Sequence, residues 1–154
     1  MNRSMIQKLA YGLATCVGIG KLPWAPGAWG TLSAIPVLLL LGQVPSSLLA
    51  AWAGLVLVSI WASGRVAKEL GVDDPGIIVI DEFCGMLTAF LFVPINGPRL
   101  VIEFIAFRLF DVTKPPPIRL LERLPGGFGI VLDDVMAGLY VQLLLQGGIR
   151  YAHL

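Results

Sequence analysis

The amino-acid sequence predicts an all-α fold, a compact helical bundle of about four apolar helices embedded in a membrane. Of the 154 residues, 56% are hydrophobic and 14% are charged, whereas an ordinary soluble domain has about 45–50% apolar and about 25% charged residues. One small domain lacks the core volume to hide this much apolar surface from water. Long segments also carry no ionisable side chain. We therefore treat residues 1–154 as a single domain whose excess apolar surface faces lipid.

The longest uncharged segment predicts a helical hairpin. About 43 residues between Lys21 and Arg65 carry no charge, and Gln43–Ser47 in their middle is a turn signal. We expect one helix over Thr31–Leu41 and a second over Leu48–Ala62. Each is shorter than the ~20 residues of an ideal span, so crossing requires flanking uncharged residues and some local thinning of the bilayer.

Three further apolar segments follow the hairpin. Phe83–Pro98 is uncharged and ends in a Gly-Pro turn signal. Leu100–Phe110 predicts a fourth helix, but its Glu103 and Arg108 prevent it from facing lipid on all sides. Whether this helix spans the bilayer is left open. Val135–Ile149 is the last apolar stretch.

Basic side chains set the predicted orientation. They flank the first hairpin and reappear after the fourth helix, so the positive-inside rule makes these segments cytoplasmic and the turn at Gln43–Ser47 external. The basic residues are Arg3, Lys8, Lys21, Arg65, Lys68, Lys114, Arg119 and Arg123. The alternative is a soluble bundle of unusually apolar helices.

Charge, cysteine and histidine content exclude several classes of function. The net charge of +1, without a basic stripe, gives no reason to expect nucleic acid as a partner. Cys16 and Cys84 stand in apolar surroundings and indicate neither a disulfide framework nor a zinc site. The single histidine, His153, leaves no basis for Ser-His-Asp or Cys-His catalysis or for a histidine nucleophile.

Acidic residues converge on one side of the predicted bundle. Seven of the ten fall at the cytoplasmic ends of predicted helices or in the loops there: Asp73, Asp74, Asp81, Glu82, Asp111, Asp133 and Asp134. Carboxylates gathered without matching bases repel one another, and a divalent cation removes that repulsion. Oxygen ligands favour Mg²⁺ or Mn²⁺ over zinc, and Mg²⁺ commonly joins carboxylates to a substrate phosphate.

Helix capping is a simpler explanation for two of these acids. Asp81 and Asp133 each belong to an acidic pair that we expect to open an apolar helix, and aspartate is a favoured N-cap. Capping does not explain why the acids are doubled. It also does not explain Asp111 at the end of a helix, where the dipole disfavours an anion.

Two other runs of sequence have alternative interpretations. Pro115–Pro117 cannot continue a helix, so Asp111 and Lys114 stand on a stiff corner. There Lys114 can neutralise charge on a phosphoryl group, or act only as a positive-inside anchor. The glycine-rich run Gly18–Thr31 lacks the P-loop pattern. It can bring backbone amides to an anion, and is equally typical of an interfacial loop anchored by tryptophans.

Three runs, taken together, resemble the signatures of the phosphatidylglycerophosphatase A family. The first is Gly20–Leu32, with the sequence GKLPWAPGAWGTL. The second combines residues 73–75 (DDP) with Val79–Gly85 (VIDEFCG). The third combines Phe107–Pro115 (FRLFDVTKP) with Gly126–Gly138 (GGFGIVLDDVMAG). The matches occur in order and extend over most of the chain.

The resemblance implies an all-helical fold in which helices surround a central one. It implies a multi-pass protein of the bacterial inner membrane with its active site on the cytoplasmic side. The implied reaction is Mg²⁺-dependent hydrolysis of the phospholipid phosphatidylglycerophosphate to phosphatidylglycerol and inorganic phosphate. The alternatives are a related phosphatase acting on another phosphate ester, and a small membrane carrier with cation sites at the acids. The oligomeric state is left open.

The motifs also supply expected roles for individual residues. The expected metal ligands are Asp81, Glu82, Asp133 and Asp134. The expected catalytic residues are Asp111, Lys114 and Asp81, with Asp111 completing the metal site or acting as a base. The expected substrate-binding residues are Lys21, Pro26, Gly27, Thr31 and Arg108.

Overall fold

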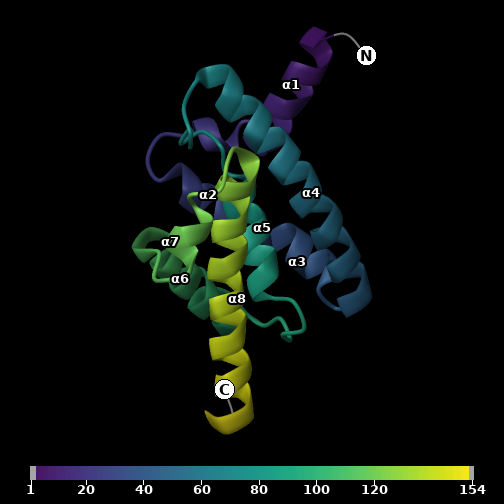
Figure 1. Cartoon of the computed structure of the whole chain (residues 1–154). Coiled ribbons are helices and arrows are strands. Elements are labelled where there is room, and N and C mark those ends of the chain that lie inside the picture. Colours follow the sequence, from purple (N-terminus) through teal and green to yellow (C-terminus); the bar gives the residue numbers. More distant parts are fainter. Residues whose placement is uncertain (1–2, 153–154) are drawn as a thin grey trace.

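Helices of unequal length make up the computed structural model, which describes residues 3–152 (Figure 1). His153 lies outside the described residues. The elements are α1 (Arg3–Ala14), the 3₁₀ helix η1 (Ile19–Lys21), α2 (Pro26–Ser33), α3 (Ile35–Leu41), α4 (Pro45–Leu70), α5 (Ile80–Ala89), α6 (Gly97–Thr113), α7 (Ile118–Leu121) and α8 (Gly127–Ala152). No strand occurs within residues 3–152, so the all-α prediction is confirmed.

The first predicted helix is divided in two. α2 ends at Ser33 and α3 begins at Ile35, with Pro36 in its first turn. Because Pro36 has no N–H, it cannot extend the hydrogen-bond pattern of α2. The prediction of one helix over Thr31–Leu41 is therefore wrong. The second predicted helix, Leu48–Ala62, lies wholly inside the longer α4.

The apolar segment Phe83–Pro98 is not one helix. Only its first part belongs to α5, which ends at Ala89, and the chain then turns through Phe92 at φ 63° before α6 begins. The predicted helix Leu100–Phe110 lies inside α6. α1 was not predicted as a helix.

The start of α8 also differs from the prediction. The helix begins at Gly127, directly after Gly126 at φ 60°, and not near Val135 where the apolar stretch begins. The acidic pair Asp133–Asp134 therefore lies inside α8 and does not open it. A glycine in the left-handed region is what lets the chain turn sharply into the helix at this point.

In the part of the chain that the structure describes, two helices are long and apolar enough to cross a membrane. They are α4 and residues Gly127–Arg150 of α8. In its most apolar window α4 is 28% buried, whereas α8 is 61% buried. α8 therefore supplies much of the core, while α4 leaves apolar side chains such as Leu57 on the surface. The other predicted apolar segments form shorter helices.

α5 is the helix that its neighbours surround. It contacts α1, α2, α4, α6 and α8, and eight of its residues are buried. Figure 1 shows α8 running beside it along the length of the molecule. Close approach of the two backbones requires glycines on both helices. A Cβ on Gly138 would lie 2.7 Å from Thr88 Cβ, and one on Gly85 would lie 2.8 Å from the Asp134 carbonyl oxygen.

Gly138→Ala is expected to destabilise the protein by roughly 1–3 kcal/mol, because the added methyl group forces α5 and α8 apart. Gly147→Ala, in the same helix but with nothing within 4 Å of its Cβ, is the matched control and is expected to stabilise by up to about 1 kcal/mol. Thermal unfolding followed by circular dichroism measures both. Equal melting temperatures for the two variants would show that the glycine contact does not set the helix spacing.

Candidate active site

Three carboxylates from two helices meet in the interior. Asp81 and Glu82 lie in the first turn of α5, and Asp134 lies two turns into α8. One carboxylate oxygen from each residue lies within 4.8 Å of the others. Asp81 and Asp134 are only 6% and 3% exposed. Because little water screens them, negative charges at this separation repel strongly.

The carboxylate cluster formed by Asp81, Glu82 and Asp134 has the properties of a cation-binding site. Burial and the neighbouring carboxylates raise the pKa of Asp81, and burial raises the pKa of Glu82. Asp81 Oδ1 and Glu82 Oε2 are buried without a hydrogen-bond partner, which is uncommon for buried polar atoms. A divalent cation bound here would supply the missing partner and the missing charge, and an all-oxygen ligand set suits Mg²⁺. Asp81, Glu82 and Asp134 therefore fit the expected metal.

Asp133 faces a different partner. Its Oδ2 atom lies 2.5 Å from Lys114 Nζ, and its Oδ1 atom accepts a hydrogen bond from the Asp134 backbone N–H at 2.9 Å. Lys114 also donates to Glu122 at 3.1 Å. Burial lowers the pKa of Lys114, but the bond to Asp133 and the nearby acids outweigh burial, so the net shift is upward. The ammonium group therefore stays charged, and metal binding by Asp133 stays a prediction.

The stiff corner of the chain predicted at Pro115–Pro117 holds Lys114 in place. Lys114 is the C-cap of α6 and has a left-handed conformation at φ 43°. Its side chain is 18% exposed. It therefore points into the protein towards Asp133 and does not serve only as a surface anchor.

Arg108 connects α6 to the carboxylate cluster. Its Nη1 atom lies 2.5 Å from Asp111 Oδ2, one turn further along α6, and 3.6 Å from Glu82 Oε1. Gly27 of α2 packs against the same pair, since a Cβ there would lie 2.8 Å from Arg108 Nη1 and would overlap the Glu82 carboxylate. A methyl group at position 27 would therefore force the ends of the Glu82 and Arg108 side chains to shift.

A cavity of about 230 Å³ lies over the carboxylates. The predicted residues that line it are Pro26, Gly27, Asp81, Glu82, Arg108, Asp111, Lys114, Asp133 and Asp134. Lys21 and Thr31 do not line it. Lys21 is exposed in η1. Thr31 is fully buried, and its hydroxyl donates to the Gly27 carbonyl at 2.9 Å, a contact internal to α2.

The capping explanation of the acids is wrong. The N-cap of α5 is Val79, so Asp81 lies inside the helix. Asp133 lies further inside α8. Neither carboxylate occupies the position from which an N-cap bonds the first free N–H groups.

Two acidic residues of the site were not assigned roles from the sequence. Asp74 lines the cavity; it belongs both to the second signature and to the converging acids, so a signal existed. Glu122 bonds Lys114 from the turn after α7, eight residues further along the chain. No motif or spacing indicates Glu122, because the contact depends on how the chain folds back after the prolines.

Comparison with known proteins identifies the family. The sequence model of phosphatidylglycerophosphatase A matches residues 12–149, which include every residue that lines the cavity. The chain belongs to the phosphatidylglycerophosphatase A family. It is therefore a phosphoric monoester hydrolase, and the enzyme prediction is confirmed over the carrier alternative.

Individual relatives agree with this assignment. The chain is 37% identical over 142 residues to phosphatidylglycerophosphatase A of Escherichia coli K12, covering 90% of this chain and 80% of the relative. It is 35% identical over 141 residues to phosphatidylglycerophosphatase A of Haemophilus influenzae, covering 86% and 84%. A protein of Bacteroides thetaiotaomicron, whose name proposes a phosphatidylinositol-3-phosphatase, is 35% identical over 142 residues, covering 86% and 89%. No solved structure matches the chain.

Proposed function

We propose that this member of the phosphatidylglycerophosphatase A family hydrolyses the terminal phosphate of phosphatidylglycerophosphate, with Mg²⁺, at the cytoplasmic face of the bacterial inner membrane. The observation that carries the proposal is the group of three close carboxylates with two unpartnered oxygens, beside the charged Lys114. Carboxylates that lack enough cationic partners are suited to bind a metal ion. A metal ion beside a lysine is in turn suited to bind a phosphate group.

Asp81, Glu82 and Asp134 are the residues that would hold Mg²⁺. When bound, the ion supplies Lewis-acid polarisation of a phosphoryl oxygen and helps to orient the ester. The protein positions these ligands, because α5 packs against both α2 and α8. Rigid placement of charges around the reacting group is a large part of catalysis in such sites.

Lys114 and Arg108 balance the negative charge of the ester. Both side chains line the cavity, and both already pair with acids, Lys114 with Asp133 and Arg108 with Asp111. These pairs fix the direction of each cation before substrate enters. We assign Asp111 as the base that takes a proton from the attacking water, because it lines the cavity and its Oδ2 atom is held by Arg108.

The membrane location is part of the same proposal. The start of α8 packs against the last turns of α4, since a Cβ on Gly127 would lie 2.8 Å from the backbone N of Gly64. Asp134 lies two turns into α8, so the carboxylates lie near one end of the two helices long enough to span. Arg65 and Lys68 lie near that same end of α4. By the positive-inside rule this end is cytoplasmic. A phospholipid substrate in the cytoplasmic leaflet then has its phosphate at the depth of the site.

Phosphate release from two lipids with matched acyl chains tests the proposed substrate. With Mg²⁺ present, kcat/KM is expected to be about tenfold or more higher for phosphatidylglycerophosphate than for phosphatidylinositol 3-phosphate. The reason is that a cavity of about 230 Å³ admits a phosphate on a flexible glycerol more readily than one on a ring. The reverse preference would favour the second candidate, which the Bacteroides relative's name suggests. Release from neither lipid by folded protein would overturn the lipid phosphatase proposal.

A further inference from the structure

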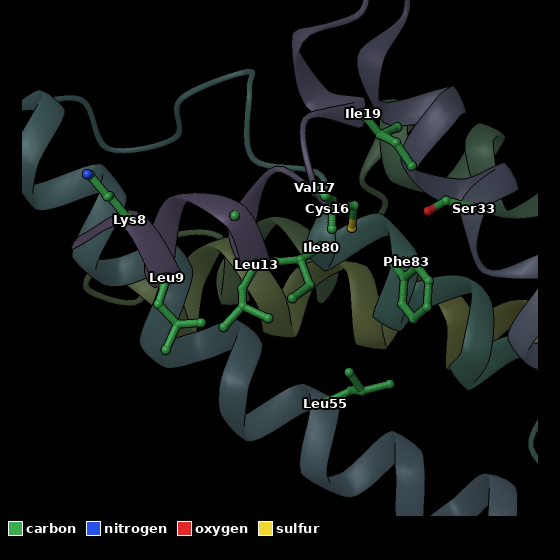
Figure 2. Close-up of a pocket in the computed structure, with 11 residues that line it drawn as sticks. Lys8, Leu9, Leu13, Cys16, Val17, Ile19, Ser33, Leu55, Ile80 and Phe83 are labelled. Atoms are coloured by element: carbon green, nitrogen blue, oxygen red, sulfur yellow. The ribbon is translucent and has the colours of Figure 1, made fainter. Parts of the chain in front are cut away.

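An apolar groove lies beside the active site. It has a volume of about 490 Å³, within the range of about 300–1,000 Å³ that is usual for small-molecule sites. Figure 2 shows Leu13 of α1, Leu55 of α4, and Ile80 and Phe83 of α5 around it, with Lys8 at one end. The groove thus runs from Lys8 in the middle of α1 to Leu55 in the middle of α4, the less buried of the two helices long enough to span a membrane.

The groove offers one charge and almost no other polar partner. Lys8 is exposed and, among residues 3–152, is the only charged residue that lines it. The Ser33 hydroxyl is already used, since it donates to the Gly30 carbonyl at 2.6 Å. Burial raises the pKa of the Cys16 thiol to about 12, so this side chain stays neutral. A ligand that matches these walls has a long aliphatic body and an anionic group at one end.

Helix geometry places the groove on the opposite side of α5 from the carboxylates. Ile80 and Phe83 are three residues apart and share one face of the first turn, while Asp81 and Glu82 project from the other. Closely packed backbone separates the groove from the carboxylates. A Cβ on Gly30 of α2 would lie 2.7 Å from the Val79 carbonyl oxygen, and the Val79 N–H donates to the Ala14 carbonyl at 2.9 Å.

We propose that this groove binds one acyl chain of an anionic bilayer phospholipid, with its phosphate at Lys8, as a lipid site separate from the substrate. The proposal rests on the membrane location in the proposed function and not on the identity of the substrate. The bound chain packs on the back of the turn that carries Asp81 and Glu82. The lipid therefore supports the geometry of the metal site without taking part in hydrolysis.

Photolabelling of the full chain in nanodiscs tests this proposal. The probe is phosphatidylglycerol with a photoactivatable acyl chain, and labelled residues are located by mass spectrometry. Labelling is expected at Leu13, Leu55 and Phe83, well above labelling of Leu57, which is 70% exposed on the surface of α4. Equal labelling of the groove and of Leu57 would overturn the proposal, since it would indicate only general contact with lipid.

Two variants locate the lipid in the groove. Gly12 lines it and has nothing within 4 Å of its Cβ, so Gly12→Phe is expected to fill the groove and reduce labelling about tenfold. Gly54→Phe, at an equally open helical glycine that does not line the groove, is the matched control. Unchanged labelling in Gly12→Phe would contradict the proposal.

A surface variant tests the anionic end and does not depend on how the fold tolerates a new ring. Lys8→Gln is expected to reduce labelling by phosphatidylglycerol about fivefold and to leave labelling by a zwitterionic phosphatidylcholine probe unchanged. Equal effects on both probes would overturn the role of Lys8.

Competition distinguishes the lipid from the substrate. Excess phosphatidylglycerophosphate is added to compete with the photoactivatable probe. Displacement of the probe at a concentration equal to the KM for phosphatidylglycerophosphate would show that the groove holds the substrate's own acyl chain, against the proposal. Groove labelling without any phosphate release would leave this inference intact while the proposed function failed.

Discussion

Asp81→Asn and Glu82→Gln are each expected to reduce phosphate release about a thousandfold. Each change keeps the size of the side chain and removes the negative charge that a bound cation requires. Burial and mutual repulsion already work against these charges. The metal-free variants are therefore expected to melt at the same temperature as the unmodified protein or at a higher one, as is usual when strain at a functional site is relieved.

Glu69→Gln is the matched control for the same chemical change. Glu69 is exposed in the last turn of α4 and lies outside the cavity, so turnover is expected to stay within about twofold of the unmodified enzyme. Initial rates of phosphate release and thermal melting measure both properties. Near-normal turnover in Asp81→Asn or Glu82→Gln would contradict their proposed role as metal ligands.

Lys114→Met is the second change with a large expected effect, a loss of about a hundredfold in kcat. The substitution removes the cation that we propose to face the phosphate. It also leaves the Asp133 carboxylate, 3% exposed, without its partner, so the protein is expected to lose about 3–5 kcal/mol of stability. Two effects therefore occur together in the single variant.

A double variant separates these two effects. Lys114→Met with Asp133→Asn removes both charges of the pair, and is expected to recover most of the stability while activity stays low. Lys68→Met, at an exposed lysine in the last turn of α4, is the control and is expected to leave both properties unchanged. Recovery of activity along with stability in the double variant would mean that Lys114 only supports the fold.

The elements that the sequence predicted well were those whose signal is local. The acidic pair Asp81–Glu82 was expected to open a helix, and it lies in the first turn of α5. Pro115–Pro117 was expected to stop a helix and stiffen a corner, and α6 ends just before it with Lys114 as its C-cap. In both places residues close in the chain decide the backbone.

The errors arose where apolar composition was taken as a measure of helix length. α8 begins at Gly127, ahead of the apolar stretch, because its first turns are set by tertiary packing. A Cβ on Gly127 would lie 2.8 Å from the backbone N of Gly64 on α4. The apolar pattern of a single segment contains no information about that contact.

The side-chain contacts within the site also could not be predicted from the sequence. Asp133 and Lys114 are 19 residues apart and meet only because the chain reverses through α7. The motifs therefore identified the acids and the lysine, but not that Asp133 faces Lys114 while Asp81, Glu82 and Asp134 form a separate group. A motif shows which side chains are present. Which of two neighbouring groups a side chain contacts depends on how its helix is rotated about its axis.

The most direct test of the central claim is phosphate release from phosphatidylglycerophosphate by one preparation of the purified protein, first stripped of metal with a chelator and then returned to Mg²⁺. We predict release at background level after stripping and full recovery when Mg²⁺ is restored, with circular dichroism unchanged between the two states. Undiminished release by the stripped protein would contradict the assignment of Asp81, Glu82 and Asp134 as the ligands of a metal that hydrolysis requires.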